Sequence, residues 1–456
     1  MNRQAASMEA LVSLAKRRGF IFQGSDIYGG LAGTFDYGPL GVALRENLKK
    51  IWKDVSVNRR DDMYEIDASL IMHSKVWEAS GHTETFTDPL VSDKETGERY
   101  RLDHVLEALD IDPVGMTLDQ MWDALVASGA KSPNGNEYAY PMTFNLLFPV
   151  SMGASETSAA LAYLRGETAQ GIFVNFKNII DAYHPKLPFG MAQIGKAFRN
   201  EIAPREFVFR SREFEQMEVE YFIRPENWEA AFADWQEAMR TYAQEVGIEM
   251  KALHEKEIEK EDRAHYSKRT VDFEFEFPAG TKELWGLAYR TDYDLSRHSE
   301  YSKVDLSYFD DATGERFVPH VIEPSLGLDR TMFAVLASAY DEDELGGDTR
   351  VVLHLNPKVA PVKMMVSPLL KNKPDLVAKA KEVRAALKKI HPAIAWDDNG
   401  NIGKRYRRQD EIGTPWCVTI DFDTLEDGTM TIRERDTGEQ VRVSLDEVVE
   451  RLKAAV

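Results

Sequence analysis

The sequence predicts an α+β fold, in which helices pack beside an antiparallel sheet, followed by a smaller α/β domain. Apolar and acidic residues alternate from 271 to 277, the two-residue period of a half-buried strand, and we expect its acids on a solvated face. Residues 228–246 carry apolar side chains at steps of three and four, which predicts a helix with a broad core-facing stripe. No GxGxxG or GxxxxGK(S/T) motif follows a predicted strand, which argues against a dinucleotide fold and a P-loop.

Length and composition bound the class of protein. At 456 residues the chain exceeds what one hydrophobic core sustains, so two or three domains are expected. It has no run of about 18 uncharged apolar residues, and its first 20 residues predict an amphipathic helix rather than a signal peptide. We therefore expect a cytoplasmic protein with no membrane partner. The single cysteine, Cys417, and the scattered histidines argue against disulfides and structural zinc.

Charge is unevenly distributed along the chain. The formal net charge of −20 argues against a nucleic-acid partner, because phosphate neutralisation needs lysine and arginine. Residues 350–456, however, contain 19 basic and 16 acidic residues, so the acidic excess lies before residue 350. The distribution of charge matters more than its sum, and the C-terminal part is nearly neutral.

The clearest boundary is the acidic stretch DEDELGGD at residues 341–348. Such residues cannot bury apolar surface, so the stretch predicts a solvated linker. Beyond it the pattern predicts strands at 351–355 and 416–422, a hairpin leading to a strand from 430, and helices at 375–390 and from 444. This alternation indicates a partly parallel sheet. The predicted divisions are residues 1–340, a linker at 341–349, and residues 350–456.

A predicted hairpin around a polar loop gathers charged residues on one face. On its first strand, alternate side chains share a face, namely those of Gln193, Gly195, Ala197, Arg199 and Glu201. The loop carries Arg205, Arg210 and Arg212, and the second strand directs one set to the same side, namely Phe214, Gln216, Glu218 and Glu220. Burying these groups costs desolvation unless a ligand satisfies them; an exposed, salt-bridged hairpin is the alternative. Guanidinium, carboxylate and aromatic groups suit phosphate, the adenine amino group and the adenine ring, which favours ATP.

The segment VIEPSLGLDR, residues 321–330, predicts a second anion-binding element. A strand ends near Glu323, Pro324 fixes a turn, and Gly327 lets the backbone approach a ligand closely. Arg330 then lies in the first turn of an apolar helix, where a positive charge opposes the helix dipole unless an anion compensates it. A triphosphate would supply that anion.

These motifs resemble those of class II aminoacyl-tRNA synthetases. FRNE, with the arginine loop and REFEQMEVE, resembles motif 2, and GLDR entering an apolar helix resembles motif 3. Longer stretches are similar to the dimeric type of glycyl-tRNA synthetase, in that family's order: RRGFIFQGSDIYGGLAGTFDYGPLG, WEASGH, GETAQGIFVNF, ELWGLAYRTDYDL, EPSLGLDR and GKRYRRQDEIGTP. The resemblance implies an antiparallel class II catalytic domain with an insertion at about 91–149, and a C-terminal α/β anticodon-binding domain. It also implies the ATP-dependent attachment of glycine to the 3′ end of tRNA(Gly) through a glycyl-adenylate.

The resemblance implies an ATP site built from the hairpin and the GLDR helix. Arg199 would hold the α-phosphate, Glu201 the adenine amino group, and Phe214 the adenine ring. Arg330 would contact the γ-phosphate, and Glu283 would carry Mg²⁺. Arg199, Glu201 and Arg330 are the implied catalytic residues. The other implied ATP contacts are Asn200, Phe209, Arg210, Ser211, Arg212, Glu213, Leu284, Gly327, Leu328 and Asp329.

The resemblance also implies an acidic glycine site. Glu167, Glu218, Glu323 and Ser325 match positions around the glycine ammonium group, and Arg101 matches another substrate contact. The other implied substrate contacts are Phe214, Glu215, Gln216, Met217, Pro324, Leu326 and Gly327. Glycine has no side chain, so its selection must come from excluding a Cβ in a small pocket.

Further features concern partners and metals. Apolar residues within 40–52 predict an amphipathic helix, which by family precedent contributes to a homodimer; packing within the chain is the alternative. The cluster KRYRR at 404–408 suits unstacked RNA bases and indicates anticodon contact, a solvated face being the alternative. The insertion lacks the cysteine pairs of many relatives, so no zinc is expected there. The family's RPET reads RGET at 165–168, which loses the rigid φ of proline beside Glu167.

Two rival functions remain open. One is a class II synthetase for another small amino acid, such as serine, proline or threonine. The other is a synthetase-like binding protein, such as a polymerase accessory subunit, that has lost catalysis. A pure binding protein would not need the whole set of implied contacts, namely Arg199, Glu201, Phe214, Glu323 and Arg330.

Overall fold

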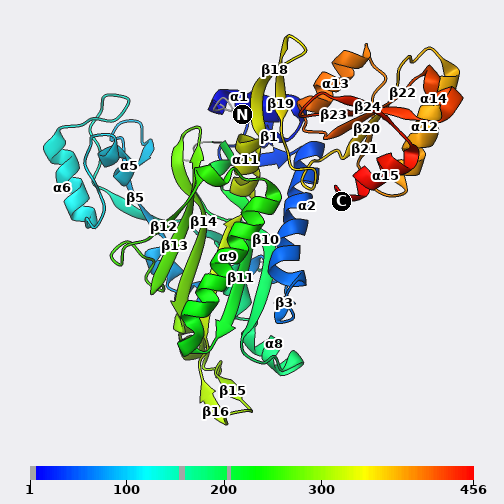
Figure 1. Cartoon of the computed structure of the whole chain (residues 1–456). Coiled ribbons are helices and arrows are strands. Elements are labelled where there is room, and N and C mark those ends of the chain that lie inside the picture. Colours follow the sequence, from blue (N-terminus) through cyan, green and yellow to red (C-terminus); the bar gives the residue numbers. More distant parts are fainter. Residues whose placement is uncertain (1–6, 154–159, 203–206) are drawn as a thin grey trace.

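The computed structural model describes residues 7–153, 160–202 and 207–456, so Arg205 of the predicted loop lies outside the described residues. A seven-stranded sheet forms the centre of the larger part of the chain (Figure 1). Its strands, in spatial order, are β12 Leu253–Glu257, β13 Arg269–Phe277, β14 Gly280–Thr291, β17 His320–Gly327, β11 Glu213–Ile223, β10 Phe189–Phe198 and β3 Met63–Glu65. All neighbouring strands are antiparallel except β10 and β3, which are parallel. The predicted α+β class is confirmed.

The predicted hairpin is formed by β10 and β11. Their antiparallel register places Ala197 opposite Phe214 and Gly195 opposite Gln216. Strand β10 ends at Phe198, however, so Arg199 and Glu201 follow the strand instead of continuing its face. The strand predicted at 193–201 is therefore too long at its end, because residues 199–201 lie beyond it.

One face of the central sheet is apolar. Three helices cover it, namely α2 Pro39–Lys53, α9 Trp228–Val246 and α11 Leu328–Ala339. The stripe of α9, including Trp235, packs with Met217 and Val219 of β11 in one core. Leu44 and Leu48 of α2 are buried in the same core. The apolar stripe predicted at 40–52 therefore packs within the chain, the alternative to a dimer contact.

The opposite face is apolar only at one end. There Phe176, Phe189 and Phe222 form a separate cluster. The surrounding helices are α7 Ala169–Phe173, α8 Phe176–Tyr183 and α10 Tyr293–Ser302. Gln193, Gln216, Glu218 and Glu220 occupy the rest of this face. The alternation along β11 thus divides an apolar core from a polar surface that remains buried.

Smaller elements surround the central sheet. They are α1 Met8–Arg18, β1 Ile21–Gln23, β2 Phe35–Tyr37, β4 Ile71–His73, α3 Ser74–Ala79, α4 His82–Thr85, β8 Phe148–Met152, β9 Ala160–Leu164, β15 Tyr308–Asp310 and β16 Glu315–Phe317. Helix α1 confirms the amphipathic helix predicted near the start. Within the described parts of the chain, no helix has both the length and the apolar character needed to cross a membrane.

The predicted insertion forms a lobe at the left of Figure 1. It contains β5 Thr87–Ser92, β6 Arg99–Arg101, α5 Leu102–Glu107, α6 Leu118–Ser128 and β7 Met142–Asn145. The strands form a sheet in the order β6-β5-β7. Val91, Leu102, Leu106 and Leu125 give the lobe a core of its own, separate from that of the central sheet.

The acidic stretch 341–348 is not an irregular linker. It lies in a hairpin of β18 Tyr340–Leu345 and β19 Asp348–Leu353, which turns at Gly346 and Gly347, both with positive φ. The strand predicted at 351–355 pairs back onto the acidic stretch. Arg350 makes this possible, because its buried guanidinium binds Asp343 at 2.5 Å and Asp410 of the C-terminal domain at 3.0 Å.

The C-terminal domain confirms the predicted α/β pattern. Its sheet, in spatial order, contains β21 Ile394–Trp396, β20 Met364–Pro368, β22 Trp416–Ile420, β23 Met430–Glu434 and β24 Gln440–Val443. Strands β21, β20 and β22 are parallel to one another, whereas β23 is antiparallel to both β22 and β24. Its helices are α12 Pro374–Lys388, α13 Ile402–Asp410, α14 Phe422–Asp427 and α15 Leu445–Lys453. Strand β20 was not predicted, and α14 replaces the predicted simple hairpin before β23.

The basic cluster at 404–408 does not form one exposed surface. Arg405 is buried and donates to Ser367 Oγ at 2.7 Å and the Pro368 carbonyl at 2.6 Å. Tyr406 is buried and shares a hydrogen bond with Thr419. Because α13 packs one side on the sheet, the sequence cluster is divided between the domain interior and its surface.

Gly41 tests the packing of α2. An added Cβ would lie 1.9 Å from the carbonyl oxygen of Phe20, so Gly41→Ala must push the helix away from that backbone. We expect it to destabilise the protein by about 1–3 kcal/mol and to lower its Tm in a thermal unfolding scan.

Gly403→Ala is the matched control in helix α13. Its Cβ would meet nothing closer than Asn401 Oδ1 at 3.8 Å. Alanine favours a helix over glycine by up to about 1 kcal/mol, so the Tm should stay unchanged or rise. Equal Tm values for the two variants would contradict the close packing of α2 on Phe20.

Candidate active site

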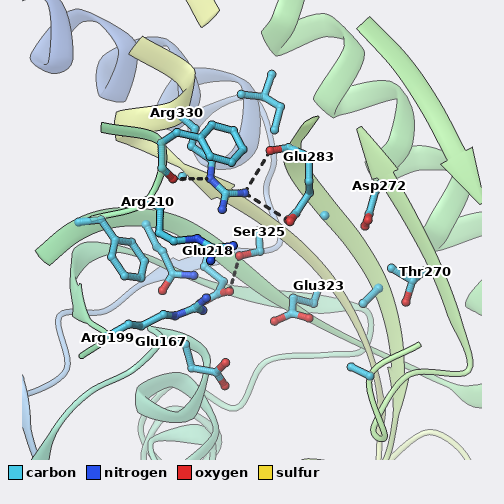
Figure 2. Close-up of a pocket in the computed structure, with 18 of the residues that line it drawn as sticks. Glu167, Arg199, Arg210, Glu218, Thr270, Asp272, Glu283, Glu323, Ser325 and Arg330 are labelled. Carbon is cyan, nitrogen blue, oxygen red and sulfur yellow. Dashed lines mark hydrogen bonds and ion pairs between the residues drawn. The ribbon is translucent and has the colours of Figure 1, made fainter. Parts of the chain in front are cut away.

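A cavity of about 520 Å³ opens on the polar face of the central sheet. Figure 2 shows Arg330 and Glu283 on one side of it, Arg199 and Glu167 on the other, and Glu218 between them. The structure brings these predicted residues together around the cavity: Arg101, Glu167, Arg199, Glu201, Phe209, Arg210, Ser211, Phe214, Gln216, Glu218, Glu283, Leu284, Glu323, Ser325, Gly327, Asp329 and Arg330.

Arg199 is held where β10 ends. Its backbone nitrogen donates to the Arg212 carbonyl at 2.9 Å, which keeps the hairpin closed beyond the last strand pair. Its Nε donates to the Gly166 carbonyl at 3.1 Å. The guanidinium carbon lies 5.1 Å from the centre of the Phe86 ring and 5.2 Å from that of Phe214. Two rings and one carbonyl thus fix a cation in the wall of the cavity.

Glu201 and Phe214 lie beside this arginine in the cavity wall. Glu201 is buried, and its Oε2 atom has no hydrogen-bond partner among the described residues. A buried carboxylate oxygen without a donor is costly, so it is suited to accept a hydrogen bond from a ligand. Phe214 adds an apolar ring to the same wall.

Arg330 occupies the opposite wall, in the first turn of α11. Its Nε donates to the Phe209 carbonyl at 3.2 Å, and its guanidinium lies 4.3 Å from the Phe209 ring centre. The Glu283 carboxylate lies 3.3 Å from Arg330 Nη1 and supplies the compensating anion. Figure 2 shows this pair facing the open space of the cavity.

Asp272 corrects the expectation that the acids of residues 271–277 are all solvated. It lines the cavity, because its face of β13 continues the polar face of the sheet. Burial and the nearby Glu283 carboxylate raise the pKa of Asp272 to about 7. The two-residue period predicted the strand, but it could not distinguish solvent from an internal cavity.

The inner end of the cavity is acidic. Glu218 accepts hydrogen bonds from Ser325 Oγ at 2.6 Å and from the Thr168 hydroxyl. Glu167 accepts from Gln170 Nε2 at 3.0 Å, and its Oε2 lies 3.2 Å from His82 Nε2. Although burial alone would raise it, His82 and Arg290 hold the pKa of Glu167 well below its usual range.

Arg290 is the counter-charge that the sequence prediction missed. Its side chain is only 1% exposed, and it lies at the end of β14. It binds Asp294 through two contacts of 2.8 Å and Glu323 Oε1 at 2.7 Å. The only signal in the sequence was an arginine directly after the apolar run of β14, inside a stretch already quoted for its family resemblance.

Some predicted contacts lie away from the cavity. Met217 and Leu326 belong to the apolar core, because they alternate along their strands with residues that face the ligand space. Leu328, the first residue of α11, is buried in the same core. Pro324 is buried, and neither it nor Asn200 lines the cavity.

Several charged residues of the predicted set are paired within the protein, whether or not they reach the cavity. Glu213 pairs with Lys196, and Arg212 donates to the Glu201 carbonyl at 2.9 Å. Glu215 pairs with Arg45 at 2.6 Å. Asp329 reaches the cavity edge, but its carboxylate accepts from Tyr37, Arg45 and the Glu215 backbone. Arg101 lines the cavity while binding Asp88 at 2.9 Å and Asp103 at 2.5 Å.

Arg290 tests the electrostatics of the inner end. Arg290→Met leaves Asp294 and Glu323 buried without their cation, so we expect a loss of about 3–5 kcal/mol in the free energy of unfolding. Urea unfolding followed by tryptophan fluorescence measures it.

Arg316→Met is the control for Arg290→Met. It breaks an exposed pair with Asp305, at 3.3 Å, and should cost less than about 1 kcal/mol. If both variants unfold at the same urea concentration, the buried pairs of Arg290 do not stabilise the fold.

The family described as tRNA synthetase class II core domain (G, H, P, S and T) matches residues 155–339, and the Anticodon binding domain family matches residues 363–455. The glycine–tRNA ligase of Caldanaerobacter subterraneus subsp. tengcongensis is 47% identical over 450 residues, covering 97% of each chain. That of Thermus thermophilus is 46% identical over 503 residues, covering 98% of this chain and 99% of its own. On this evidence the chain belongs to the glycine–tRNA ligase family of class II aminoacyl-tRNA synthetases.

Proposed function

We propose that this chain uses ATP to attach glycine to the 3′ end of tRNA(Gly), through a glycyl-adenylate intermediate. One observation carries the proposal. A single cavity has arginines in two facing walls, Arg199 and Arg330, and buried carboxylates at its inner end. The cations suit a triphosphate and the acids suit an ammonium group, so one cavity accommodates both ends of the reaction.

The outer part of the cavity is proposed to bind ATP. Arg199 would contact the α-phosphate, with Phe214 stacked on adenine and the free Glu201 oxygen accepting from its amino group. Arg330 would contact the γ-phosphate from the opposite wall. Its contact with Glu283 is 3.3 Å long and half-exposed, so a phosphate can compete for the guanidinium.

Mg²⁺ is proposed to bind on the Glu283 side of the cavity. Glu283 and Asp272 both line this part and present carboxylate oxygens, the ligand type that Mg²⁺ prefers. When bound, the ion would neutralise phosphate charge. Glu283 also lies 3.3 Å from Arg330 Nη1, so phosphate, cation and arginine can share this wall.

The inner end is proposed to bind glycine. Glu167, Glu218 and Glu323 surround the place for the ammonium group, and the Ser325 hydroxyl orients Glu218. These side chains are proposed to leave no room for a Cβ beside the bound ammonium group, which would provide exclusion that affinity alone would not.

The chemistry requires positioning more than a protein nucleophile. A glycine carboxylate oxygen bonds to the α-phosphorus while the bond to the β-phosphate oxygen breaks and pyrophosphate leaves. The 3′-terminal ribose hydroxyl of the tRNA then attacks the acyl carbon, and AMP leaves. Arg199 and Arg330 would stabilise the charge that develops on the phosphates in the first step.

The C-terminal domain is proposed to contact the anticodon of the tRNA. The match of residues 363–455 to an anticodon-binding family supports this role, as does the nearly balanced charge of this part. The enzyme is proposed to work in the cytoplasm, where its tRNA would be charged for translation.

ATP–pyrophosphate exchange tests the function. Glycine should drive exchange, while alanine and serine should not; exchange driven by either of those instead of glycine would favour another small amino acid. Arg199→Ala should reduce exchange at least about 100-fold, because it removes a cation from the reacting phosphate.

Arg316→Ala is the matched control for Arg199→Ala, since it removes an exposed arginine of β16 that is not among the residues lining the cavity. It should leave exchange unchanged, and circular dichroism should show that both variants fold. Normal exchange by Arg199→Ala would contradict the phosphate role. A complete absence of exchange in the unaltered chain would favour a non-catalytic binding protein.

We also propose that two copies of the chain form a homodimer. The apolar stripe of α2 is used within the chain, so support comes from elsewhere. Ile27 and Tyr28 are 89% and 87% exposed in a short 3-10 helix, Asp26–Tyr28, and Leu31 and Val42 nearby are also exposed. Such side chains are costly in water and are typical of an interface.

The dimer predicts a light-scattering mass of twice the 51.8 kDa of one chain. Replacing both exposed residues, Ile27→Asp with Tyr28→Asp, should shift the protein towards the mass of one chain, because charge would be buried in the contact. The control, Val114→Asp, changes an exposed valine of the insertion and should leave the mass unchanged. A single-chain mass for the unaltered protein at micromolar concentration would contradict the dimer.

A further inference from the structure

Glu220 is a buried acid that the proposed reaction does not use. Its side chain is 0% exposed, and neither carboxyl oxygen has a hydrogen-bond partner among the described residues. It follows Glu218 by two positions on β11, so both side chains point to the polar face. Carboxyl oxygens of Glu218, Glu220 and Glu323 lie within 4.8 Å of one another. Glu220 thus lies directly beside two proposed glycine ligands.

The three acids differ in what stabilises their charge. Glu323 Oε1 accepts a hydrogen bond from Arg290 at 2.7 Å, and Glu218 accepts hydrogen bonds from the Ser325 and Thr168 hydroxyls. Glu220 accepts no hydrogen bond from the described residues. Hydrogen bonds and cations favour the ionised form of a carboxyl group, so the proton in this cluster belongs on the member that lacks them.

The charged groups facing Glu220 come from several elements. They are Glu218 on its own strand, Glu323 on β17, Arg290 on β14 and Asp294 on α10. From α7, Gln170 contributes only a neutral amide, which is bound to Glu167 and Asp294. Arg290 already binds Asp294 and Glu323, so it does not neutralise a third carboxylate. An ionised Glu220 would be a buried charge without a partner.

We propose that Glu220 is a neutral carboxylic acid beneath the glycine site, and that it is a positioning residue which keeps Glu218 and Glu323 ionised and apart. The part that concerns glycine rests on the proposed function. Burial and the neighbouring carboxyl groups raise the pKa of Glu218, and they raise the pKa values of Glu220 and Glu323 well above the usual range, so the cluster favours a proton. The partners that Glu218 and Glu323 have and that Glu220 lacks place this proton on Glu220. A neutral acid fills the floor of the site without adding a third negative charge.

The protonation state is tested without any substrate. A carboxyl group whose pKa is higher in the folded than in the unfolded state takes up a proton on folding when the pH lies between the two values. The free energy of unfolding therefore falls as the pH rises through that range. The unfolding equilibrium shifts by up to tenfold for each pH unit between the two pKa values. Relative to the unaltered chain, Glu220→Gln should therefore raise the Tm increasingly from pH 5 to pH 8. The control Glu300→Gln, on an exposed acid, should show no such widening.

Two Tm results would overturn the proposal. One is a constant Tm difference between Glu220→Gln and the unaltered chain from pH 5 to pH 8. The other is a fall in the Tm of the unaltered chain, but not of Glu220→Gln, when EDTA is added. That result would mean that a metal cation, rather than a proton, neutralises Glu220.

The positioning role is tested by glycine-dependent exchange. Glu220→Ala should raise KM for glycine at least about tenfold, since it leaves a void between two like charges. Glu220→Gln should rescue most of that loss, because an amide is neutral and similar in shape. Glu323→Gln changes the ionised neighbour and should lose glycine-dependent exchange. If instead Glu323→Gln keeps this exchange and Glu220→Gln loses it, the proton belongs on Glu323 and the proposal is overturned.

The two parts of the test fail separately. If the unaltered chain shows no glycine-dependent exchange, the proposed function is wrong, while the Tm measurements still decide the protonation state of Glu220. If exchange is normal but the Tm difference is constant, the function stands and the neutral acid does not.

Discussion

Arg290, whose side chain is only 1% exposed, makes ion pairs with Asp294 and Glu323, and the acidic end of the cavity depends on these buried pairs. Isolated carboxylates would not remain ionised at this depth, because desolvation would favour protonation. One planar guanidinium holds both acids in fixed directions. The sheet can therefore keep charged side chains on its buried face.

The opposite wall depends on a second buried network. The Asp329 carboxylate accepts from Tyr37, Arg45 and the Glu215 backbone, which joins α2, β11 and the start of α11. Asp329 and Arg330 are adjacent in the chain but face different directions. The first anchors the helix start to the core, and the second is thereby directed into the cavity. The resemblance grouped both residues as ATP contacts, and both line the cavity, although the Asp329 carboxylate is hydrogen-bonded within the protein.

Local periodicity explains what could be predicted from the sequence. The two-residue period located β11 and β13, and the spacing of three and four located α9. Period alone could not show that β10 ends at Phe198, so that Arg199 reaches the cavity from the segment that follows the strand.

The remaining errors concern partners that are distant in sequence. Arg350 of the hairpin that replaces the predicted linker pairs not only with Asp343 but also with Asp410, which lies 60 residues further along the chain. The positions of Arg290 and Asp272 depend on the pairing of β13, β14 and β17, which local sequence does not reveal. The roles in ATP and glycine binding came from resemblance, because composition and spacing cannot assign a ligand to a buried charge.

The same long-range pairing connects the two domains. Arg350 of β19 binds Asp410 of α13 with its side chain fully buried, and Asp410 also binds Arg433 of β23 at 2.8 Å. At the other end of the chain, Arg18 of α1 pairs with Glu411, which directly follows α13. Buried ion pairs have strict directional requirements, unlike apolar contacts, which tolerate sliding. The C-terminal domain is therefore held in a defined orientation to the cavity, as a tRNA that must contact both parts at once would require.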